Sequence, residues 1–238
     1  MSTPNFRFKH FTIWHDQCAM KVGTDGVLLG AWAPIRDEWT KGERTNVKRI
    51  LDVGTGSGLI ARMLMQRCPE AEVEGIDVDE SAVRQAKENG VNAYLSRLQE
   101  WNGGPYGLIV SNPPYFRNSL KNPDEGRKTA RHTDTLSYEE LIEHSARLLT
   151  KDGQLALILP ADEEKLVREL AAENGLQVTR ITRVYSKETK PVRRVMLCFA
   201  KFEILDCRFQ FLEDTLVLED DKGGRSAAYQ ELTKDFYL

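Results

Sequence analysis

Residues 49–58 read Arg-Ile-Leu-Asp-Val-Gly-Thr-Gly-Ser-Gly, and residues 59–67 continue as Leu-Ile-Ala-Arg-Met-Leu-Met-Gln-Arg. The short apolar run predicts a buried strand that ends at a turn. The three glycines predict a loop against which a flat ligand can lie without interference from a Cβ atom. The following residues have the spacing of a helix, so the stretch predicts the first strand, loop and helix of a nucleotide-binding α/β fold.

The next stretch along the chain extends this fold. Residues 72–79 predict a second strand that ends in acids, and residues 80–89 predict a helix with a polar face. Asp77 follows Gly58 by nineteen residues. At the end of the second strand, its carboxylate is placed to accept hydrogen bonds from both hydroxyls of a ribose. This order of elements predicts a site for an adenosine.

The glycine loop also distinguishes between adenosine cofactors. Because Leu59 follows Gly58, the loop does not complete the G-x-G-x-x-G/A pattern that binds the pyrophosphate of NAD. S-Adenosylmethionine has no pyrophosphate, and Asp25 and Asp52 can hold its ammonium group. We therefore predict S-adenosylmethionine as the cofactor. The predicted cofactor contacts are Thr24, Asp25, Asp52, Gly54, Thr55, Gly56, Gly58 and Asp77.

Residues 109–116, Ile-Val-Ser-Asn-Pro-Pro-Tyr-Phe, predict a buried strand that runs into a rigid turn, because two prolines can neither continue a strand ladder nor enter a helix. An amide, fixed carbonyls and an aromatic face at this turn suit a flat ring with an exocyclic amine, such as adenine. The oxygen of Asn112 and the carbonyl of Pro113 can each accept one N–H of that amine, which frees its lone pair for attack on a methyl group. This chemistry requires neither a metal nor a strong general base. The predicted catalytic residues are Asn112, Pro113, Pro114 and Tyr115.

An adenine can reach such a turn only when it is unstacked, and structured RNA loops present bases in that state. Tyr115 or Phe116 can stack on the base. Basic residues in segments 127–132 and 187–194 flank the sheet edge where RNA would enter, and the alternative is that they form a solvated charged surface. The predicted substrate contacts are Phe116, Arg127, Lys128, Arg131, His132, Lys187, Lys190, Arg193 and Arg194.

The rest of the chain predicts one doubly wound α/β sheet of seven strands, mostly parallel. Residues 1–20 predict a strand or hairpin, which either caps the domain or contacts the substrate. Thr24 or Asp25 can cap a helix that begins near Gly26. Only the basic segment 186–194 separates the last two strands, so we expect them to pair antiparallel. The later elements are predicted over residues 138–149 (helix, N-cap Ser137), 154–159 (strand), 162–174 (helix), 177–185 (strand) and 195–202 (strand).

The composition indicates an ordinary globular protein. Its 238 residues are 41% hydrophobic and 29% charged, with a net charge of −3, and no apolar run approaches the roughly 20 residues of a membrane helix. The N-terminus lacks the apolar core of a secretory signal, so we expect a cytoplasmic protein. The four cysteines show no C-x-x-C spacing, which argues against a metal site or a disulfide framework. We expect no membrane, metal or obligate protein partner.

Three segments are predicted. Residues 1–48 form an N-terminal strand and helix cap that includes a cofactor-contacting segment, residues 49–202 form the core, and residues 203–238 form an acidic extension. The boundaries follow the polar stretch 36–48 and the end of the last predicted core strand.

Several motifs together resemble a known family. They are K-V-G-T-D-G-V-L-L-G (21–30), L-D-V-G-T-G-S-G (51–58), S-N-P-P-Y-F (111–116), A-R-H (130–132) and L-T-K-D-F-Y (232–237). The chain resembles, over its full length, the bacterial tRNA1(Val) adenine-N6 methyltransferases, which modify the adenine beside the anticodon. The resemblance implies a Rossmann-like class I methyltransferase fold and an anticodon-loop substrate. It also implies cofactor contacts at Asp25, Asp52, Gly54 and Asp77, and amine contacts from Asn112 to Tyr115.

Two positions differ from the family pattern. Gly107 stands where the family has Asp, and only seventeen residues, 90–106, precede it where a longer segment with another strand is expected. Residues 94–98 are the possible remnant of that strand, and its loss would weaken the enclosure of the cofactor's adenine. The alternative functions are a protein glutamine methyltransferase, for which no helical N-terminal domain precedes the core, an rRNA guanine methyltransferase, and a catalytically silent binding module.

Overall fold

The computed structural model describes residues 4–18, 20–35, 49–113, 136–201 and 211–238. An N-terminal hairpin consists of β1 (Asn5–Arg7) and β2 (Thr12–Trp14). The strands of the main sheet are β3 (Arg49–Val53), β4 (Glu72–Asp77), β5 (Asn92–Leu95), β6 (Tyr106–Ser111), β7 (Leu149–Pro160), β8 (Leu176–Tyr185), β9 (Val192–Lys201) and β10 (Leu212–Val217). The helices are α1 (Thr24–Trp32), α3 (Leu59–Arg67), α4 (Glu80–Glu88), α5 (Tyr138–Leu148), α6 (Glu164–Glu173) and α7 (Ala227–Thr233), with a 3-10 turn η2 (Ala161–Glu163).

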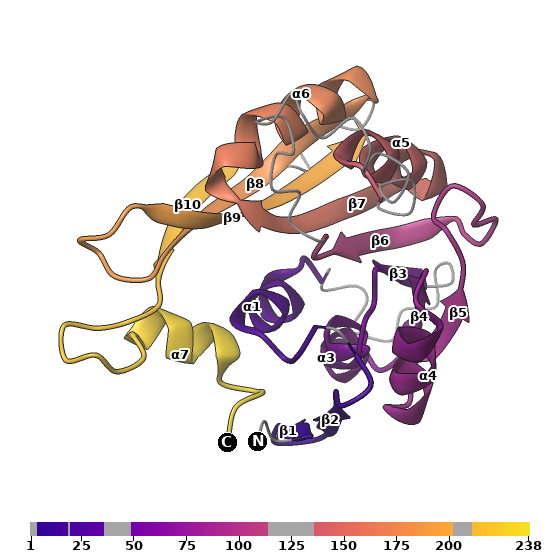
Figure 1. Cartoon of the computed structure of the whole chain (residues 1–238). Coiled ribbons are helices and arrows are strands. Elements are labelled where there is room, and N and C mark those ends of the chain that lie inside the picture. The colour runs from indigo at the N-terminus through magenta and orange to yellow at the C-terminus, as the bar shows by residue number, and fades with distance from the viewer. Residues whose placement is uncertain (1–3, 19, 36–48, 114–135, 202–210) are drawn as a thin grey trace, which may run out of the picture.

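The main sheet has the strand order β10-β8-β9-β7-β6-β3-β4-β5 (Figure 1). Strands β5, β4, β3, β6 and β7 pair in parallel, so their carboxyl ends meet at one edge of the sheet. Strand β9 runs antiparallel to both β7 and β8. The predicted mostly parallel sheet and its antiparallel last pair are therefore confirmed, and β8 ends at the same edge as β6 and β7.

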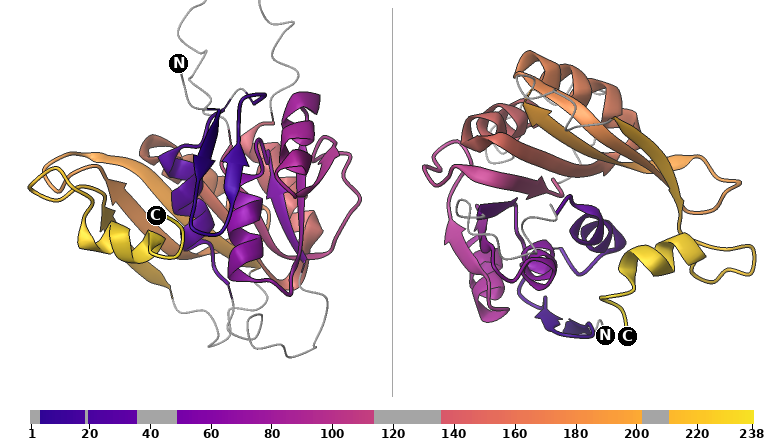
Figure 2. Two further views of the ribbon diagram at one scale, coloured as in Figure 1. Left: turned by 90° about the horizontal axis from the view of Figure 1, so that it is seen from below. Right: turned by 180° about the vertical axis from the view of Figure 1, so that it is seen from behind.

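Two helical layers cover the sheet (Figures 1 and 2). Alternate residues of the central strands point to opposite faces, so Ile50 packs with α1, α3 and α4, and Leu51 packs with α5 and α6. Burial on both faces explains why the central strands are continuous apolar runs. Among the described helices, none has both the length and the apolar character needed to cross a membrane.

Two helix starts test the sequence predictions. The N-cap of α5 is Ser137, which forms a capping box with Glu140, as its sequence predicts. Helix α1 begins at Thr24 with Gly23 as its N-cap, and no side chain caps it. The prediction that Thr24 or Asp25 caps this helix is therefore wrong, and both side chains are left for other contacts.

Segment 90–106 contains a strand. Residues Asn92–Leu95 form β5, which pairs in parallel with β4 from Glu74 to Asp77. Residues 94–98 were predicted as the remnant of this strand, and β5 overlaps them at residues 94 and 95; four residues are within the usual range of strand lengths. Gly107, the other departure from the family pattern, lies within β6 beside an irregularity in its pairing with β7.

The C-terminal segment adds an eighth strand that the sequence interpretation does not include. Strand β10 pairs in parallel with β8, with Leu212 opposite Arg180 and Val217 opposite Tyr185. Strand β10 alternates poorly in polarity, with four exposed residues before Leu216, so it gives no apolar signal. The division of the chain at residues 48 and 202 stays a prediction.

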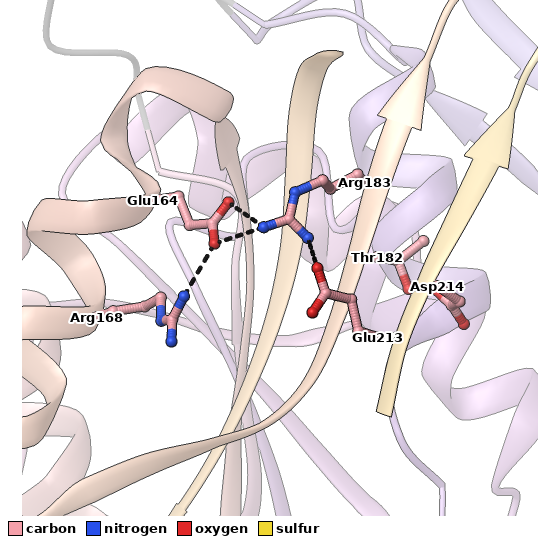
Figure 3. Close-up of polar contacts among 6 residues, drawn as sticks. All are labelled: Glu164, Arg168, Thr182, Arg183, Glu213 and Asp214. Atoms are coloured by element: carbon pink, nitrogen blue, oxygen red, sulfur yellow. Dashed lines mark hydrogen bonds and ion pairs between the residues drawn. The ribbon is translucent and has the colours of Figure 1, made fainter. Parts of the chain in front are cut away.

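Ion pairs on both faces of the sheet hold β10 against β8. On one face, Arg183 of β8 contacts Glu164 of α6 at 3.0 Å and also Glu213 of β10, and Glu164 pairs with Arg168 at 3.2 Å (Figure 3). On the other face, Asp214 of β10 accepts from the Thr182 hydroxyl and pairs with Arg180 at 3.2 Å. The acids of the C-terminal segment thus neutralise the bases of β8.

The C-terminal residues also pack on the N-terminal hairpin. The backbone N–H of Lys9 donates to the Phe236 carbonyl at 2.8 Å, and the Lys9 ammonium donates to the Lys234 carbonyl. The rings of Phe8 and Tyr237 stack with centroids 6.0 Å apart. The two ends of the described chain therefore form one small aromatic cluster beside α3.

Replacing Arg183 by Met tests the attachment of β10. The Arg183→Met variant leaves Glu164 and Glu213 without their shared partner, so the free energy of unfolding should fall by about 1–2 kcal/mol in urea titrations. Arg168→Met is the matched control, because its exposed i,i+4 pair should contribute about 0.5 kcal/mol or less. Equal losses in both variants would show that Arg183 does not anchor β10.

Candidate active site

Two hollows lie at the edge where the parallel strands end, one on each side of the glycine loop. The first, of about 250 Å³, is lined by Asp77, by apolar side chains of β4 and α4, and by residues 96–99. The second, of about 450 Å³, lies between the glycine loop and the start of α1. Asn112 and Met20 line both hollows. The arrangement suits an elongated ligand that crosses the loop.

The glycine loop presents backbone to both hollows. Gly54 and Gly56 have φ values of 70° and 54°, and a Cβ at either position would meet no atom within 4 Å. Both residues line both hollows, so the open space in front of them is available to a ligand. Gly58 differs, because a Cβ there would lie 2.8 Å from Val91 and 3.3 Å from Ala86, which places it against α4 and the turn after it rather than at the hollows.

Asp77 lies at the end of β4 and lines the first hollow. Its Oδ2 accepts from the Gly56 N–H at 2.9 Å, and its Oδ1 accepts from the Asp79 N–H at 3.0 Å. A carboxylate has about four acceptor positions, so each oxygen retains one for a ligand hydroxyl. The geometry therefore fits the predicted contact with a ribose and fixes the carboxylate against the loop.

Asp52 is fully buried and lines neither hollow. Its Oδ2 accepts from the Thr55 hydroxyl at 2.7 Å and from the Ala61 N–H at 3.2 Å, whereas no residue in the described ranges donates to its Oδ1. Burial raises the pKa of this carboxyl to about 7, against the opposing effect of those two bonds. Asp52 thus holds the loop and the start of α3, while Thr55, which it orients, lines the second hollow.

The first turn of α1 brings Thr24 and Asp25 to the second hollow. The Asp25 Oδ2 lies 2.8 Å from the Arg194 Nε, which connects this turn to β9. Arg194 is predicted as an RNA contact, and the structure places its guanidinium against a predicted cofactor contact instead. This carboxylate and guanidinium form one unit beside Asn112.

Asn112 and Pro113 follow β6 directly. The Ser111 hydroxyl donates to the Val53 carbonyl at 2.8 Å, which ties the ends of β6 and β3 together. The Asn112 Oδ1 is buried, and none of the described residues donates a hydrogen bond to it. An acceptor of this kind is costly without a donor, so it is suited to an amine brought by a ligand. Pro113 lines the first hollow.

The other predicted contacts divide into two groups. Lys187, Lys190 and Arg193 are exposed at the turn between β8 and β9, and Lys187 pairs with Glu219 at 3.3 Å. This turn is at the sheet edge that also carries Asn112. The remaining predicted residues lie outside the described ranges, and they are Pro114, Tyr115, Phe116, Arg127, Lys128, Arg131 and His132.

Sequence reasoning missed the residues that close the first hollow from the N-terminal side. Cys18 and Met20 line it, and both lie in the segment between the hairpin and α1. Burial, together with Asp77 and Asp79, raises the pKa of Cys18 to about 11, so its thiol stays protonated. The alternating pattern of residues 1–20 indicates only a half-buried strand, and no motif marks these two side chains as ligand contacts.

The geometry can now be compared with known proteins. Residues 41–174 match the family model of the methyltransferase small domain. A tRNA1(Val) (adenine(37)-N6)-methyltransferase of Bacteroides fragilis is 42% identical over 250 residues, which cover 100% of this chain and 99% of the relative. The chain belongs to this methyltransferase family. The predicted family is therefore confirmed, and its methyl donor is S-adenosylmethionine, as the sequence predicts.

Solved structures share the fold. A predicted O-methyltransferase from Agrobacterium tumefaciens superposes with a TM-score of 0.63 at 15% identity, covering 89% of this chain and 96% of that one. A T. thermophilus 16S rRNA methyltransferase in complex with AdoMet and guanosine superposes with a TM-score of 0.54 at 19% identity, covering 83% of this chain and 49% of that one. The predicted class I methyltransferase fold is thus confirmed.

The raised pKa of Asp52 predicts how stability depends on pH. Because folding raises this pKa from 3.8 to about 7, the native state binds the proton more tightly than the unfolded state between these values. The contribution of Asp52 to the free energy of unfolding therefore falls as pH rises across this window, by up to about 1.4 kcal/mol per pH unit. Asp52→Asn should remove this part of the slope in urea titrations from pH 4 to 8.

The matched control is Asp221→Asn, which removes an exposed carboxyl. Its pH profile should follow that of the wild type. If Asp52→Asn also follows the wild-type profile, the buried carboxyl keeps an ordinary pKa and the argument from burial is wrong.

Proposed function

We propose that this methyltransferase transfers a methyl group from S-adenosylmethionine to the N6 amine of adenine 37 in tRNA1(Val), beside the anticodon. The observation that carries the proposal is the buried Asn112 Oδ1, which lies where the two hollows meet and has no donor among the described residues. Relatives with this named activity, 36–42% identical over nearly the whole chain, support the same substrate. We also expect a cytoplasmic location, where such a substrate is found.

The hollows fit the cofactor. The open backbone at Gly54 and Gly56 accommodates a ligand that crosses the loop, and Asp77 can accept from the ribose hydroxyls. Thr24 and Asp25 would face the amino acid end, in the second hollow. When bound, S-adenosylmethionine supplies an electrophilic methyl group. The role of the protein is then to bind and orient the adenine amine.

Asn112 would orient the adenine amine for attack on the methyl group. An adenine amine is a poor nucleophile, because its lone pair is delocalised into the ring. If the Asn112 Oδ1 and the Pro113 carbonyl accept its two N–H groups, the nitrogen is drawn toward tetrahedral geometry and its lone pair becomes available. The same oxygen dipoles stabilise the positive charge that develops on the nitrogen, and the product loses one proton to solvent. Tyr115 would stack on the ring.

The alternative functions are not favoured. The relatives that match the whole chain are named for adenine in tRNA, not for protein glutamine or rRNA guanine. A catalytically silent module would have no use for a buried amide oxygen without a partner, since each such group destabilises the fold. The geometry at Asn112 is therefore best explained by amine methylation.

The RNA would approach over the turn between β8 and β9. Lys190 and Arg193 are exposed there, at the same sheet edge as Asn112. Lys187 forms an ion pair with Glu219 and Arg194 forms one with Asp25, so the positive charge of each is partly neutralised. We therefore assign the backbone contacts of this turn chiefly to Lys190 and Arg193, with Arg127, Lys128, Arg131 and His132 as further proposed contacts.

Substituting Asn112 tests the reaction. Asn112→Ala should lower kcat for methyl transfer to unmodified tRNA1(Val) by about 100- to 1000-fold, because one preorganised acceptor is lost. Nucleoside analysis identifies N6-methyladenosine as the wild-type product. Asn92→Ala, at the far edge of the sheet, should retain wild-type kcat. A wild type that methylates only protein or rRNA would overturn the substrate, and an unchanged Asn112→Ala kcat would overturn the mechanism.

The RNA contacts predict a salt dependence. Neutralising Lys190 and Arg193 together, as Lys190→Gln with Arg193→Gln, should raise the KM for tRNA and reduce the slope of log K against log salt by about 1.5–2. Lys151→Gln removes an exposed charge at the opposite sheet edge and should change neither value. Identical slopes for the double variant and wild type would show that this turn does not contact RNA.

A further inference from the structure

The stretch from the last residue of β2 to the start of α1 closes both hollows from the N-terminal side. We call the described residues 14–18 and 20–22 the connecting segment. Cys18 and Met20 line the first hollow, and Met20 and Lys21 line the second. Cofactor affinity must therefore depend on where this segment lies relative to the glycine loop, although the two are far apart in sequence.

One buried side chain forms hydrogen bonds to both the connecting segment and the glycine loop. Asn89, the C-cap residue of α4, is 7% exposed. Its Nδ2 donates to the Trp14 carbonyl at 2.7 Å and to the Ser57 carbonyl at 2.8 Å, and its Oδ1 accepts from the Trp14 N–H at 2.9 Å. Ser57 belongs to the glycine loop and lines the second hollow. The carboxamide therefore forms two hydrogen bonds with the backbone of Trp14, in the way a neighbouring strand would. Its second amide hydrogen is donated to the glycine loop.

A second amide on the same helix repeats the attachment. Gln85, only 1% exposed, accepts from the Gln17 N–H at 2.9 Å through its Oε1. The Gln17 side chain in turn bonds to Glu88 and Arg84 of the same helix. The other end of α4 carries Asp79 and Ala82, which line the first hollow. Helix α4 therefore supports the first hollow at one end and the connecting segment along its length.

We propose that Asn89 is a positioning residue for S-adenosylmethionine. It touches neither hollow, but it fixes the connecting segment against the glycine loop and so sets the width of the space between them. Loss of its two donated bonds should leave each part folded while allowing their separation to vary. The effect should appear in cofactor affinity and not in the chemistry at Asn112.

The Asn89→Asp substitution tests this proposal, because aspartate has nearly the same shape as asparagine but cannot donate the two hydrogen bonds. The carboxylate can still accept from the Trp14 N–H, but the atom that faces the Trp14 and Ser57 carbonyls becomes an acceptor. Two hydrogen bonds are thus replaced by contacts between oxygens. We expect the Kd for S-adenosylmethionine, measured by calorimetry without RNA, to rise on the order of 10- to 100-fold.

Asn174 provides a matched control. It is the C-cap residue of α6, and its Nδ2 donates to the Leu170 carbonyl of its own helix at 2.9 Å. Asn174→Asp also loses an amide at a helix end, but it lies far from both hollows, so its cofactor affinity should equal that of the wild type. An Asn89→Asp Kd equal to the wild-type value, or equal losses in both variants, would overturn the proposal.

Two further measurements separate positioning from general stability. Without cofactor, backbone amides of residues 20–22 should exchange hydrogen faster in Asn89→Asp than in wild type or Asn174→Asp. In turnover assays the KM for S-adenosylmethionine should rise while kcat at saturation stays near wild type, whereas Asn112→Ala lowers kcat. If Asn89→Asp does not fold, Asn89→Ala studied below its unfolding midpoint gives the same comparison, and wild-type affinity there would overturn the proposal. Because binding is measured without RNA, the result is independent of the proposed tRNA substrate.

Discussion

The buried carboxylate of Asp52 is the constraint on which the active site depends. Its Oδ2 binds the Thr55 hydroxyl and the Ala61 N–H, and so fixes the glycine loop between β3 and α3. Among the described residues none donates to its other oxygen, which makes the arrangement costly. The fixed loop turns with Gly54 and Gly56 facing open space, where a ligand can lie.

The sheet brings the other parts to that loop. Parallel strands end at one edge, so Asp77 after β4 and Asn112 after β6 reach the loop from both sides. The hydroxyl of Ser111 ties the two central strand ends together. Elements from the N-terminus then cover the edge, and their position depends on amide side chains of α4. The cover over the hollows and the strand end before Asn112 are thus held by separate sets of contacts.

The sequence predicts what is local. The apolar runs, the glycine loop, Asp77 and the turn at Asn112 each have a pattern within about ten residues, and these were predicted. The roles of Asn89 and of β10 depend on partners far along the chain, so no local pattern marks them. Arg194 was predicted as an RNA contact, but it pairs with Asp25, and Arg180 and Arg183 of β8 likewise pair with acids of β10. A charge cluster read alone cannot reveal such neutralisation.

The aromatic cluster near residues 8 and 237 has a consequence for folding. Lys9 of the hairpin and its partner Lys234 are 225 residues apart in sequence. Contacts of such high sequence separation form late in folding. The central strands can therefore pair before the hairpin docks on residues 234–237. The aromatic cluster is then among the last contacts of the fold to form.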